Sequence, residues 1–239
     1  MVDTKELVGR YAADYVQDGM VVGLGTGSTA YWFVDELGQR LADGRLQHIT
    51  GVATSRATAE QALRLGIPIV ELDRVNRLDI VIDGADETTS AFNGIKGGGG
   101  ALLHEKIVAL NSDRCVWVVG EDKVVDVLGK FPLPVEVVQF GSWNLFRQLD
   151  AAGFKPRFRK KGSDSLYITD SGNYIIDLYL EAIPNPYQLA HDLKNMVGVV
   201  EHGLFLGLTD TVLVGTADGK IKIYKQGQTE PIVVEEFEA

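Results

Sequence analysis

The sequence is poor in cysteine and lacks long apolar runs. Cys115 is the single cysteine among 239 residues, so no intrachain disulfide can form, and we expect a reduced, cytoplasmic chain. No apolar run approaches the roughly 18 residues that a membrane-spanning helix needs. Residues 1–6 lack the basic and apolar regions of a signal peptide. These features predict a protein without membrane attachment.

Basic residues are outnumbered, with 33 acidic side chains against 23 basic ones and a net charge of -10. A field of this sign repels a phosphate backbone and argues against nucleic acid as a partner. It does not argue against a small anionic substrate, because a few local lysines decide its binding. The four histidines show no two-histidine metal spacing. We therefore predict neither a metal site nor a cofactor.

Apolar residues make up 45% of the chain, which is ordinary for a globular protein of one or two domains. In the first half, short apolar runs alternate with segments of helical periodicity. The predicted strands cover residues 20–24, 48–53, 67–72, 79–82 and 115–119, and the predicted helices cover 30–41, 55–65 and 101–110. This alternation predicts an α/β fold with a doubly wound, mostly parallel sheet.

The alternation of single strands with helices ends at the two prolines of Phe131-Pro132-Leu133-Pro134. Beyond them we predict strands over 135–138, 155–159, 165–169, 174–180 and 199–202, and helices over 143–152 and 187–196. Residues 165–169 and 174–180 are expected to form a hairpin, as are 211–215 and 220–225. With the hairpin over 165–180 counted as one element, the order strand, helix, strand, strand, helix, strand is that of a ferredoxin-like α/β unit. We assign this smaller domain to 132–206 and the larger domain to 1–131 and 207–239.

The loop Gly25-Thr26-Gly27-Ser28-Thr29 follows the first predicted strand. Its N–H groups and hydroxyls open onto a helix N-terminus, which favours an anion. Ser28 stands where the dinucleotide fingerprint needs its third glycine, and no Gly-Lys-Ser/Thr closes a nucleotide P-loop. The loop therefore suits a single terminal phosphate. The alternative is an ordinary turn in which Ser28 or Thr29 caps the helix.

Two further loops carry polar residues. Asp83-Gly84-Ala85-Asp86-Glu87 places three carboxylates at a strand end, which is typical of a metal site or of proton transfer to sugar hydroxyls. The alternative is a helix start or an acidic turn. Lys96-Gly97-Gly98-Gly99-Gly100 combines a fixed positive charge with a flexible backbone that a ligand can approach closely. We expect all three loops at one edge of the sheet, outside the carboxyl ends of its strands.

Together these segments resemble type A ribose-5-phosphate isomerase. The resemblance includes Glu105-Lys106 after the glycines, Leu128 to Val137, Gly203-Leu204-Phe205 and Gly215 to Gly219, and so extends over nearly the whole chain. It implies a Rossmann-like catalytic domain with an inserted smaller domain, and an aldose–ketose isomerase of the non-oxidative pentose phosphate pathway. It also implies a homodimer or homotetramer.

The resemblance implies that ribose 5-phosphate and ribulose 5-phosphate are interconverted, with Glu105 as the general base. The substrate-binding residues that it implies are Thr26, Gly27, Ser28, Thr29, Asp83, Gly84, Ala85, Asp86, Lys96, Gly97, Gly98, Gly99 and Lys123.

Two routes are open to such an isomerase: a metal-assisted hydride shift and a proton transfer through an enediolate. The sequence offers no ligand set that contains histidine, so we predict the metal-free enediolate route. Lys96 would stabilise the oxyanion, Asp83 would assist ring opening and proton movement at the oxygens, and Asp86 would orient hydroxyls. With Glu105, these are the predicted catalytic residues.

Two other classes of protein share parts of this pattern. A sugar-phosphate sensor of a transcriptional regulator would need a basic DNA-reading element, and none precedes Met20. Such a sensor would also have no need of a base at position 105. A nucleotide-dependent oxidoreductase would need the third glycine and an acid at a strand end about 20 residues later. Ser28 fails the first condition, and Asp43 lies in a predicted loop.

Overall fold

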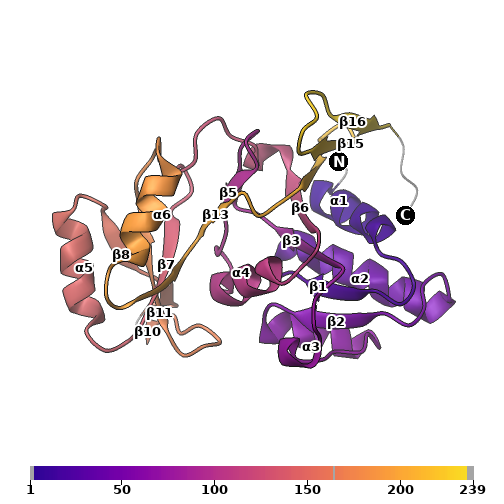
Figure 1. Cartoon of the computed structure of the whole chain (residues 1–239), viewed down its shortest axis with the longest axis horizontal. Coiled ribbons are helices and arrows are strands. Elements are labelled where there is room, and N and C mark those ends of the chain that lie inside the picture. The colour runs from indigo at the N-terminus through magenta and orange to yellow at the C-terminus, as the bar shows by residue number, and fades with distance from the viewer. Residues whose placement is uncertain (1–2, 164, 236–239) are drawn as a thin grey trace. The chain divides into compact units, whose positions relative to one another are not determined.

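The computed structural model describes residues 3–163 and 165–235. The chain forms two compact units, shown in Figure 1: Met1–Ala85 with His104–Val124 and Gly207–Ala239 (unit 1), and Asp86–Leu103 with Val125–Leu206 (unit 2). The chain passes between the units after Ala85, Leu103, Val124 and Leu206. The predicted larger domain included residues 1–2 and 236–239, which lie outside the described residues.

Unit 1 contains a seven-stranded sheet in the order β16-β15-β14-β6-β3-β1-β2. Its strands are β1 (Val21–Leu24), β2 (Thr50–Ala53), β3 (Ile80–Gly84), β6 (Cys115–Gly120), β14 (Thr211–Gly215), β15 (Ile221–Lys225) and β16 (Ile232–Val234). Five neighbouring strands of this sheet, β14, β6, β3, β1 and β2, pair in parallel. At one edge, β15 pairs antiparallel with β14, and β16 pairs antiparallel with β15. The predicted doubly wound, mostly parallel sheet is confirmed.

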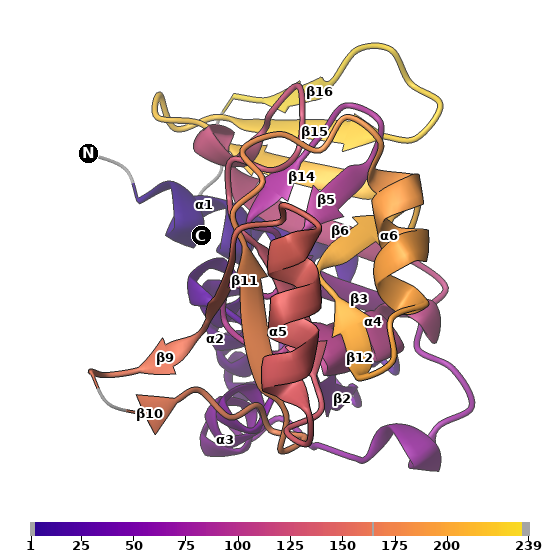
Figure 2. The ribbon, with the colours of Figure 1, turned by 90° about the vertical axis from the view of Figure 1, so that its left-hand side faces the viewer.

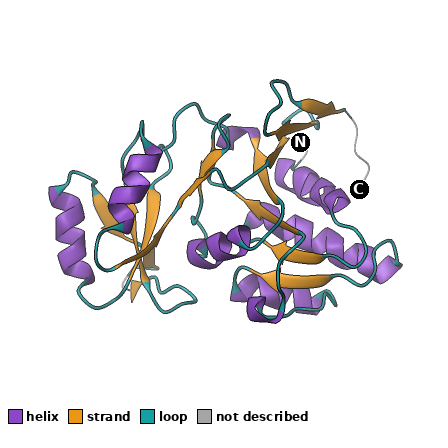
Figure 3. Cartoon of the chain, in the orientation of Figure 1, coloured by secondary structure: helices purple, strands orange, loops and turns teal. Residues whose placement is uncertain are grey.

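Helices cover both faces of this sheet, as Figure 3 shows by colour. They are α1 (Thr4–Ala12), α2 (Ser28–Asp43), α3 (Arg56–Arg64) and α4 (Leu102–Leu110), with 3-10 turns at Ala13–Tyr15, Leu72–Arg74 and Glu121–Lys123. Alternate strand residues such as Leu24 and Ile82 form one buried cluster with Phe33 and Leu37 of α2. The intervening Gly23 leaves space for Val108 of α4, because a Cβ at Gly23 would lie 2.8 Å from Val108.

The predicted strand at 67–72 is wrong. A single parallel bridge joins Ile69 to Gly51, and the chain then enters the 3-10 turn at Leu72–Arg74. Pro68 has no N–H to donate to a ladder, so it interrupts the pairing that the apolar residues predicted. Only the Pro68 carbonyl and the Val70 N–H bond to Gly51.

Unit 2 contains a four-stranded antiparallel sheet in the order β12-β7-β11-β8. Its strands are β7 (Leu133–Val137), β8 (Pro156–Phe158), β11 (Tyr174–Leu178) and β12 (Val199–His202), and its helices are α5 (Ser142–Ala151) and α6 (Pro186–Lys194). Leucines of both helices join the buried cluster of β7 and β11, and Figure 2 shows α5 in front of β11. The predicted ferredoxin-like order is confirmed.

The hairpin predicted from 165–169 and 174–180 is mostly wrong. Residues 165–166 (β10) pair with Lys160–Lys161 (β9) in a separate two-stranded ribbon, and one bridge joins Ile168 to Tyr174. The polar, glycine-containing stretch after Lys161 makes the chain fold back on β9 before it reaches β11. β11 instead pairs with β7 and β8, where its apolar side chains are buried.

A second small sheet of unit 2 was not predicted. It joins β4 (Glu87–Thr88), β5 (Asn93–Ile95) and β13 (Leu204–Leu206) in the order β13-β5-β4. Since β13 is paired with β5, residues 86–103 cluster with unit 2 rather than with unit 1. These compact units therefore differ from the predicted domain boundaries, and residues 125–131 also cluster with unit 2.

The Glu36 carboxylate on α2 gives a prediction for stability. Its side chain is 1% exposed and pairs with Arg10 at 3.1 Å, Arg40 at 2.8 Å and Arg45 at 3.3 Å. Burial lowers the pKa of Arg10, but the hydrogen bonds that Arg10 donates to Glu6 and Glu36, with the nearby charges of Asp35 and Glu6, outweigh burial and raise that pKa. We expect Glu36→Gln to lower the free energy of unfolding by about 3 kcal/mol, since the arginines lose their buried partner.

The control makes the same change in an exposed ion pair. Glu181 pairs with Lys155 at 2.7 Å, and both side chains are mostly exposed. Glu181→Gln should change stability little. Urea unfolding of both variants measures the difference. Equal stabilities would mean that the arginine cluster around Glu36 contributes nothing.

Candidate active site

The loops after β1 and β3 meet at the carboxyl edge of the unit 1 sheet. Asp83, 2% exposed, accepts N–H bonds at Oδ1 from Thr26 at 3.0 Å and from Gly84 at 2.8 Å. A Cβ at position 25 would lie 2.3 Å from this Oδ1, so only Gly25 permits the approach. The prediction that these two loops lie together is confirmed. Its physical cause is that β1 and β3 are parallel neighbours.

The Thr26 hydroxyl belongs to a cluster of hydroxyls within unit 1. Its Oγ1 lies 2.7 Å from Thr54 Oγ1, 2.9 Å from Ser55 Oγ and 3.2 Å from Thr58 Oγ1. A hydroxyl has one donor and two acceptor sites, so these neighbours use its bonding capacity. Thr26 therefore fixes the loop and holds Asp83 through its N–H.

The N-terminus of α2 follows this loop. Its N-cap is Gly27 with φ 118°, and Ser28 is the first helical residue. The alternative in which Ser28 or Thr29 is the N-cap is wrong. Because glycine has no side chain to accept the first N–H groups, this terminus keeps the positive end of a 16-residue helix for an anion. Gly27 and Ser28 are exposed, and Thr29 is half-buried.

Lys123 and Glu105 complete the predicted residues of unit 1. Lys123 ends the 3-10 turn after β6 and pairs with Asp122 at 3.2 Å, with 36% of its side chain exposed. Glu105 lies in the first turn of α4 and is 3% exposed. A helix that returns between parallel strands begins at their carboxyl edge, and a carboxylate in its first turn is favoured by the helix dipole. Gly84 and Ala85, both half-buried, continue the chain after Asp83.

Unit 2 carries Asp86 and the glycine loop. The Gly98 N–H donates to Asp86 Oδ2 at 2.7 Å, and a Cβ at Gly98 would lie 2.5 Å from Asp86 Oδ1. The Asp86 N–H donates to the carbonyl of Ile95 at 2.8 Å. These bonds bring Asp86 and the Gly97–Gly99 segment together within one unit.

Lys96 is a buried cation of unit 2, 3% exposed. Its N–H donates to the Gly203 carbonyl at 2.9 Å, and its Nζ lies 5.3 Å from the centre of the Phe205 ring. A ring face at this distance attracts an ammonium group. Burial of a lysine costs stability and is typical of functional sites.

The third loop does not follow a strand of the parallel sheet. Lys96–Gly99 follows β5, which belongs to the small β13-β5-β4 sheet rather than to the parallel sheet of unit 1. The short β4 and β5, of two and three residues, lack the apolar length that sequence patterns detect.

Glu87 has a structural role, because its carboxylate binds the backbone of residues 129–131. It is 3% exposed, and its carboxylate accepts N–H bonds from Gly129 at 2.7 Å and Phe131 at 2.5 Å. Asp86 instead bonds to Gly98. The three carboxylates of residues 83–87 therefore accept hydrogen bonds from different backbone N–H groups.

Arg159 and Tyr167 were not predicted as functional residues. Both side chains bond to carbonyls of the glycine loop within unit 2. The sequence shows Arg159 only as one of several basic residues, 157–161. No spacing links it to residues some sixty positions earlier, so no sequence signal marked it.

The described residues contain neither a metal-binding cluster of side chains nor a helix that could span a membrane. Within residues 3–163 and 165–235, no three or more His, Cys, Asp or Glu side chains are arranged to hold a metal ion. In the same residues, no helix combines the length and apolar character needed to cross a bilayer.

Comparison with known proteins identifies the family. The sequence profile of ribose 5-phosphate isomerase A (phosphoriboisomerase A) matches residues 50–219. Ribose-5-phosphate isomerase A of Streptococcus suis is 56% identical over 226 residues, which is 95% of this chain and all of the relative.

Two solved structures have a similar fold over most of their length. A D-ribose-5-phosphate isomerase in complex with phospho-erythronic acid gives a TM-score of 0.90 at 36% identity, covering 94% of this chain and 98% of that one. Ribose 5-phosphate isomerase A of Methanocaldococcus jannaschii gives 0.88 at 41% identity, covering 94% and 99%. The chain belongs to the ribose 5-phosphate isomerase A family.

Proposed function

We propose that this protein interconverts ribose 5-phosphate and ribulose 5-phosphate in the non-oxidative pentose phosphate pathway, with Glu105 as the general base. The observation that carries the proposal is the burial of Glu105, which is 3% exposed, in a chain of this family. A buried carboxylate in the first turn of a helix is held in one position, as a base needs to be. Glu105 removes the C2 proton of the open-chain aldose and returns it to C1.

The remaining catalytic roles follow from charge and hydrogen bonding. Lys96 supplies a desolvated positive charge for the oxyanion of the enediolate, where electrostatic stabilisation is strongest. Asp83 assists ring opening and moves the proton between the two reacting oxygens. Asp86 orients the sugar hydroxyls. The N–H bonds that hold Asp83 and Asp86 support these roles, because they fix each carboxylate before substrate binds.

The phosphate is assigned to the N-terminus of α2. Gly27 and Ser28 are exposed there, with Thr29 beside them, and backbone N–H groups and the helix dipole favour an anion. Lys123 supplies a second positive charge. Thr26 contributes to this site through its backbone, which holds the loop in place, because its hydroxyl is already bonded within unit 1.

The direct test is conversion of ribose 5-phosphate by the purified protein in the presence of a metal chelator. We expect ribulose 5-phosphate to form at an undiminished rate, followed by a coupled colour assay. In deuterium oxide, proton transfer through an enediolate exchanges the migrating hydrogen with solvent, so the ketose should carry deuterium at C1.

Three outcomes would contradict parts of this proposal. Folded protein without conversion would refute the activity and favour a sensor. Activity abolished by the chelator would refute the metal-free route. Complete retention of the migrating hydrogen would support a hydride shift. A hydride shift does not need Glu105 as a base.

We also propose a cytoplasmic homo-oligomer, either a dimer or a tetramer. Cys115 is the single cysteine and is buried, so the fold uses no disulfide, which is typical of a reducing compartment. Exposed apolar side chains of unit 2 support self-association: Phe140 is 96% exposed, Trp143 58% and Val197 97%. Sedimentation velocity measures the assembly.

A further inference from the structure

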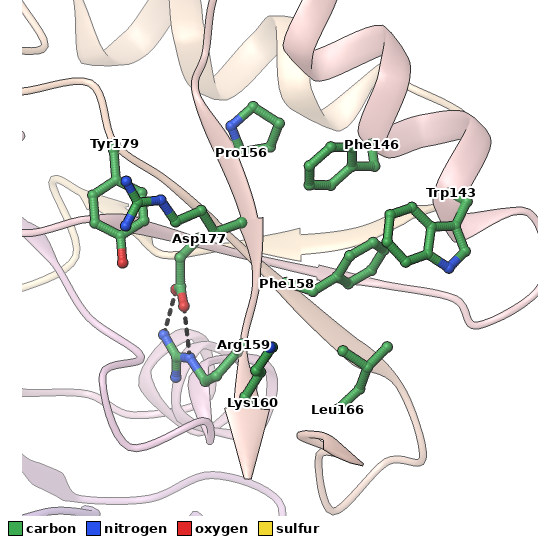
Figure 4. A pocket seen from close by; sticks show the side chains of 10 residues that line it. Trp143, Phe146, Pro156, Phe158, Arg159, Lys160, Leu166, Asp177 and Tyr179 are labelled. Atoms are coloured by element: carbon green, nitrogen blue, oxygen red, sulfur yellow. Dashed lines mark hydrogen bonds and ion pairs between the residues drawn. The ribbon is translucent and has the colours of Figure 1, made fainter. Parts of the chain in front are cut away.

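Arg159 lies between β8 and β9 of unit 2 and is paired with Asp177 of β11. Its Nε donates to Asp177 Oδ2 at 3.0 Å and its Nη2 to Asp177 Oδ1 at 2.5 Å, which makes a bidentate ion pair (Figure 4). The side chains are 15% and 13% exposed. The Arg159 N–H also donates to the Ile175 carbonyl at 2.9 Å. Both the backbone and the guanidinium of Arg159 are therefore fixed to β11.

The third nitrogen of this guanidinium bonds to the glycine loop. Arg159 Nη1 donates to the carbonyl of Gly97 at 2.7 Å and to that of Gly98 at 3.0 Å. The next carbonyl, that of Gly99, accepts from the Tyr167 hydroxyl at 3.3 Å. Burial, with the charge of nearby Asp170, raises the pKa of Tyr167, so this hydroxyl stays protonated at neutral pH. Three consecutive glycine carbonyls thus bond to side chains of the ferredoxin-like part.

The same peptide segment holds a proposed site residue. The Gly98 N–H donates to Asp86 Oδ2 at 2.7 Å, and Lys96 directly precedes these glycines. Four consecutive glycines have more backbone freedom than any other run, so their own sequence cannot fix one conformation. External hydrogen bonds have to select the conformation in which Gly98 faces Asp86.

We propose that Arg159, oriented by Asp177, is a positioning residue for the isomerase reaction, which fixes the Lys96–Gly99 segment by binding the carbonyls of Gly97 and Gly98. The inference rests on the proposed function. Arg159 acts through Asp86 and Lys96 and is not itself a catalytic residue.

A lysine cannot replace this arginine. The planar guanidinium bonds to a carboxylate through two nitrogens while the third reaches two carbonyls. An ammonium group is a single point of charge and can satisfy only part of this set. Arg159→Lys should therefore behave more like Arg159→Met than like the wild type.

The experiment compares Arg159→Met and Arg159→Lys with Arg157→Met. Arg157 and Arg159 both line an open pocket of about 660 Å³ in unit 2, and the guanidinium of Arg157 lies 4.4 Å from the centre of the Tyr179 ring. Unlike Arg159, it has no role in the proposed machinery. We expect both Arg159 variants to lower kcat about 10- to 100-fold, because small misplacements of reacting groups have effects of this size. Arg157→Met should keep the wild-type kcat.

Hydrogen exchange separates positioning from general destabilisation. Amide exchange in the peptide that contains Gly97–Gly100 should accelerate in Arg159→Met, while exchange in the α2 peptide stays at the wild-type rate. Asp177→Asn should accelerate loop exchange as well, because it frees the guanidinium. This readout needs no substrate, so it stands even if the wild-type protein does not isomerise ribose 5-phosphate.

Two results would overturn the inference. One is a kcat for Arg159→Met within about twofold of that for Arg157→Met, in a protein whose wild type is active. The other is unchanged exchange of the glycine loop in Arg159→Met. If the wild-type protein proves inactive, the proposed function is refuted. The exchange result then decides alone whether Arg159 fixes the loop.

Discussion

Replacement of Glu105 by glutamine is expected to lower kcat by about 10²- to 10⁴-fold, the usual contribution of a general base. Glutamine has the same shape as glutamate but cannot take up a proton, so the loss arises from the chemistry. Since Glu105 is 3% exposed, the neutral amide also removes the need to bury a charge. The KM for ribose 5-phosphate should change much less than kcat.

The matched control is Glu60→Gln on α3, an exposed glutamate of unit 1. It should keep full activity, and the melting temperatures of both variants should stay close to the wild type. Near-normal turnover by a folded Glu105→Gln variant would remove Glu105 from the role of base. Deuterium uptake into product by that variant would then point to another group.

Replacement of Lys96 by methionine is expected to have the second largest effect, a fall in kcat of about 10²- to 10³-fold. The charge on the enediolate oxygen exists only in the intermediate and in the transition states beside it. A cation that stabilises it therefore affects kcat more than substrate binding. Methionine preserves most of the apolar length of the lysine beside Phe205.

The control for Lys96 is Lys155→Met, since Lys155 is an exposed lysine of the same unit, with 62% of its side chain accessible. Steady-state kinetics at saturating and limiting substrate measure kcat and KM separately. A Lys96→Met variant that raises KM but keeps kcat would show that Lys96 binds ground-state substrate only. That result would refute its role at the oxyanion.

Sequence patterns predicted the large elements of the fold because their apolar residues recur with a clear period. β1, β3 and β6 and the helices α2 and α3 fall where the apolar runs and the helical periodicity place them. The patterns failed where pairing depends on distant chain. Pro68 interrupts the predicted strand at 67–72, and β4 and β5 exist because β13, about a hundred residues later, pairs with β5.

The same limit applies to the side chains of the candidate site, because contacts with residues distant in the sequence could not be predicted. Asp83 and Gly25 could be paired from sequence, because the ends of parallel strands meet at one edge. Thr26 was predicted as a phosphate ligand, yet its hydroxyl has three hydroxyl neighbours from the segment 54–58. Arg159 could not be predicted, because it lies some sixty residues after Gly97 and Gly98, whose carbonyls it binds, and no sequence spacing links them.

The chain crosses four times between its two units, which limits how recombination between related genes can exchange one unit. Neither unit is one continuous stretch of the gene, so a deletion or a single cut cannot release either of them whole. Asp83 and Asp86 stand on the two sides of the first passage, and Lys96 and Glu105 on the two sides of the second. Recombination that exchanged one unit between relatives would need junctions inside this stretch. Junctions after Ala85 and Leu103 would place Asp83 and Glu105 from one parent beside Asp86 and Lys96 from the other.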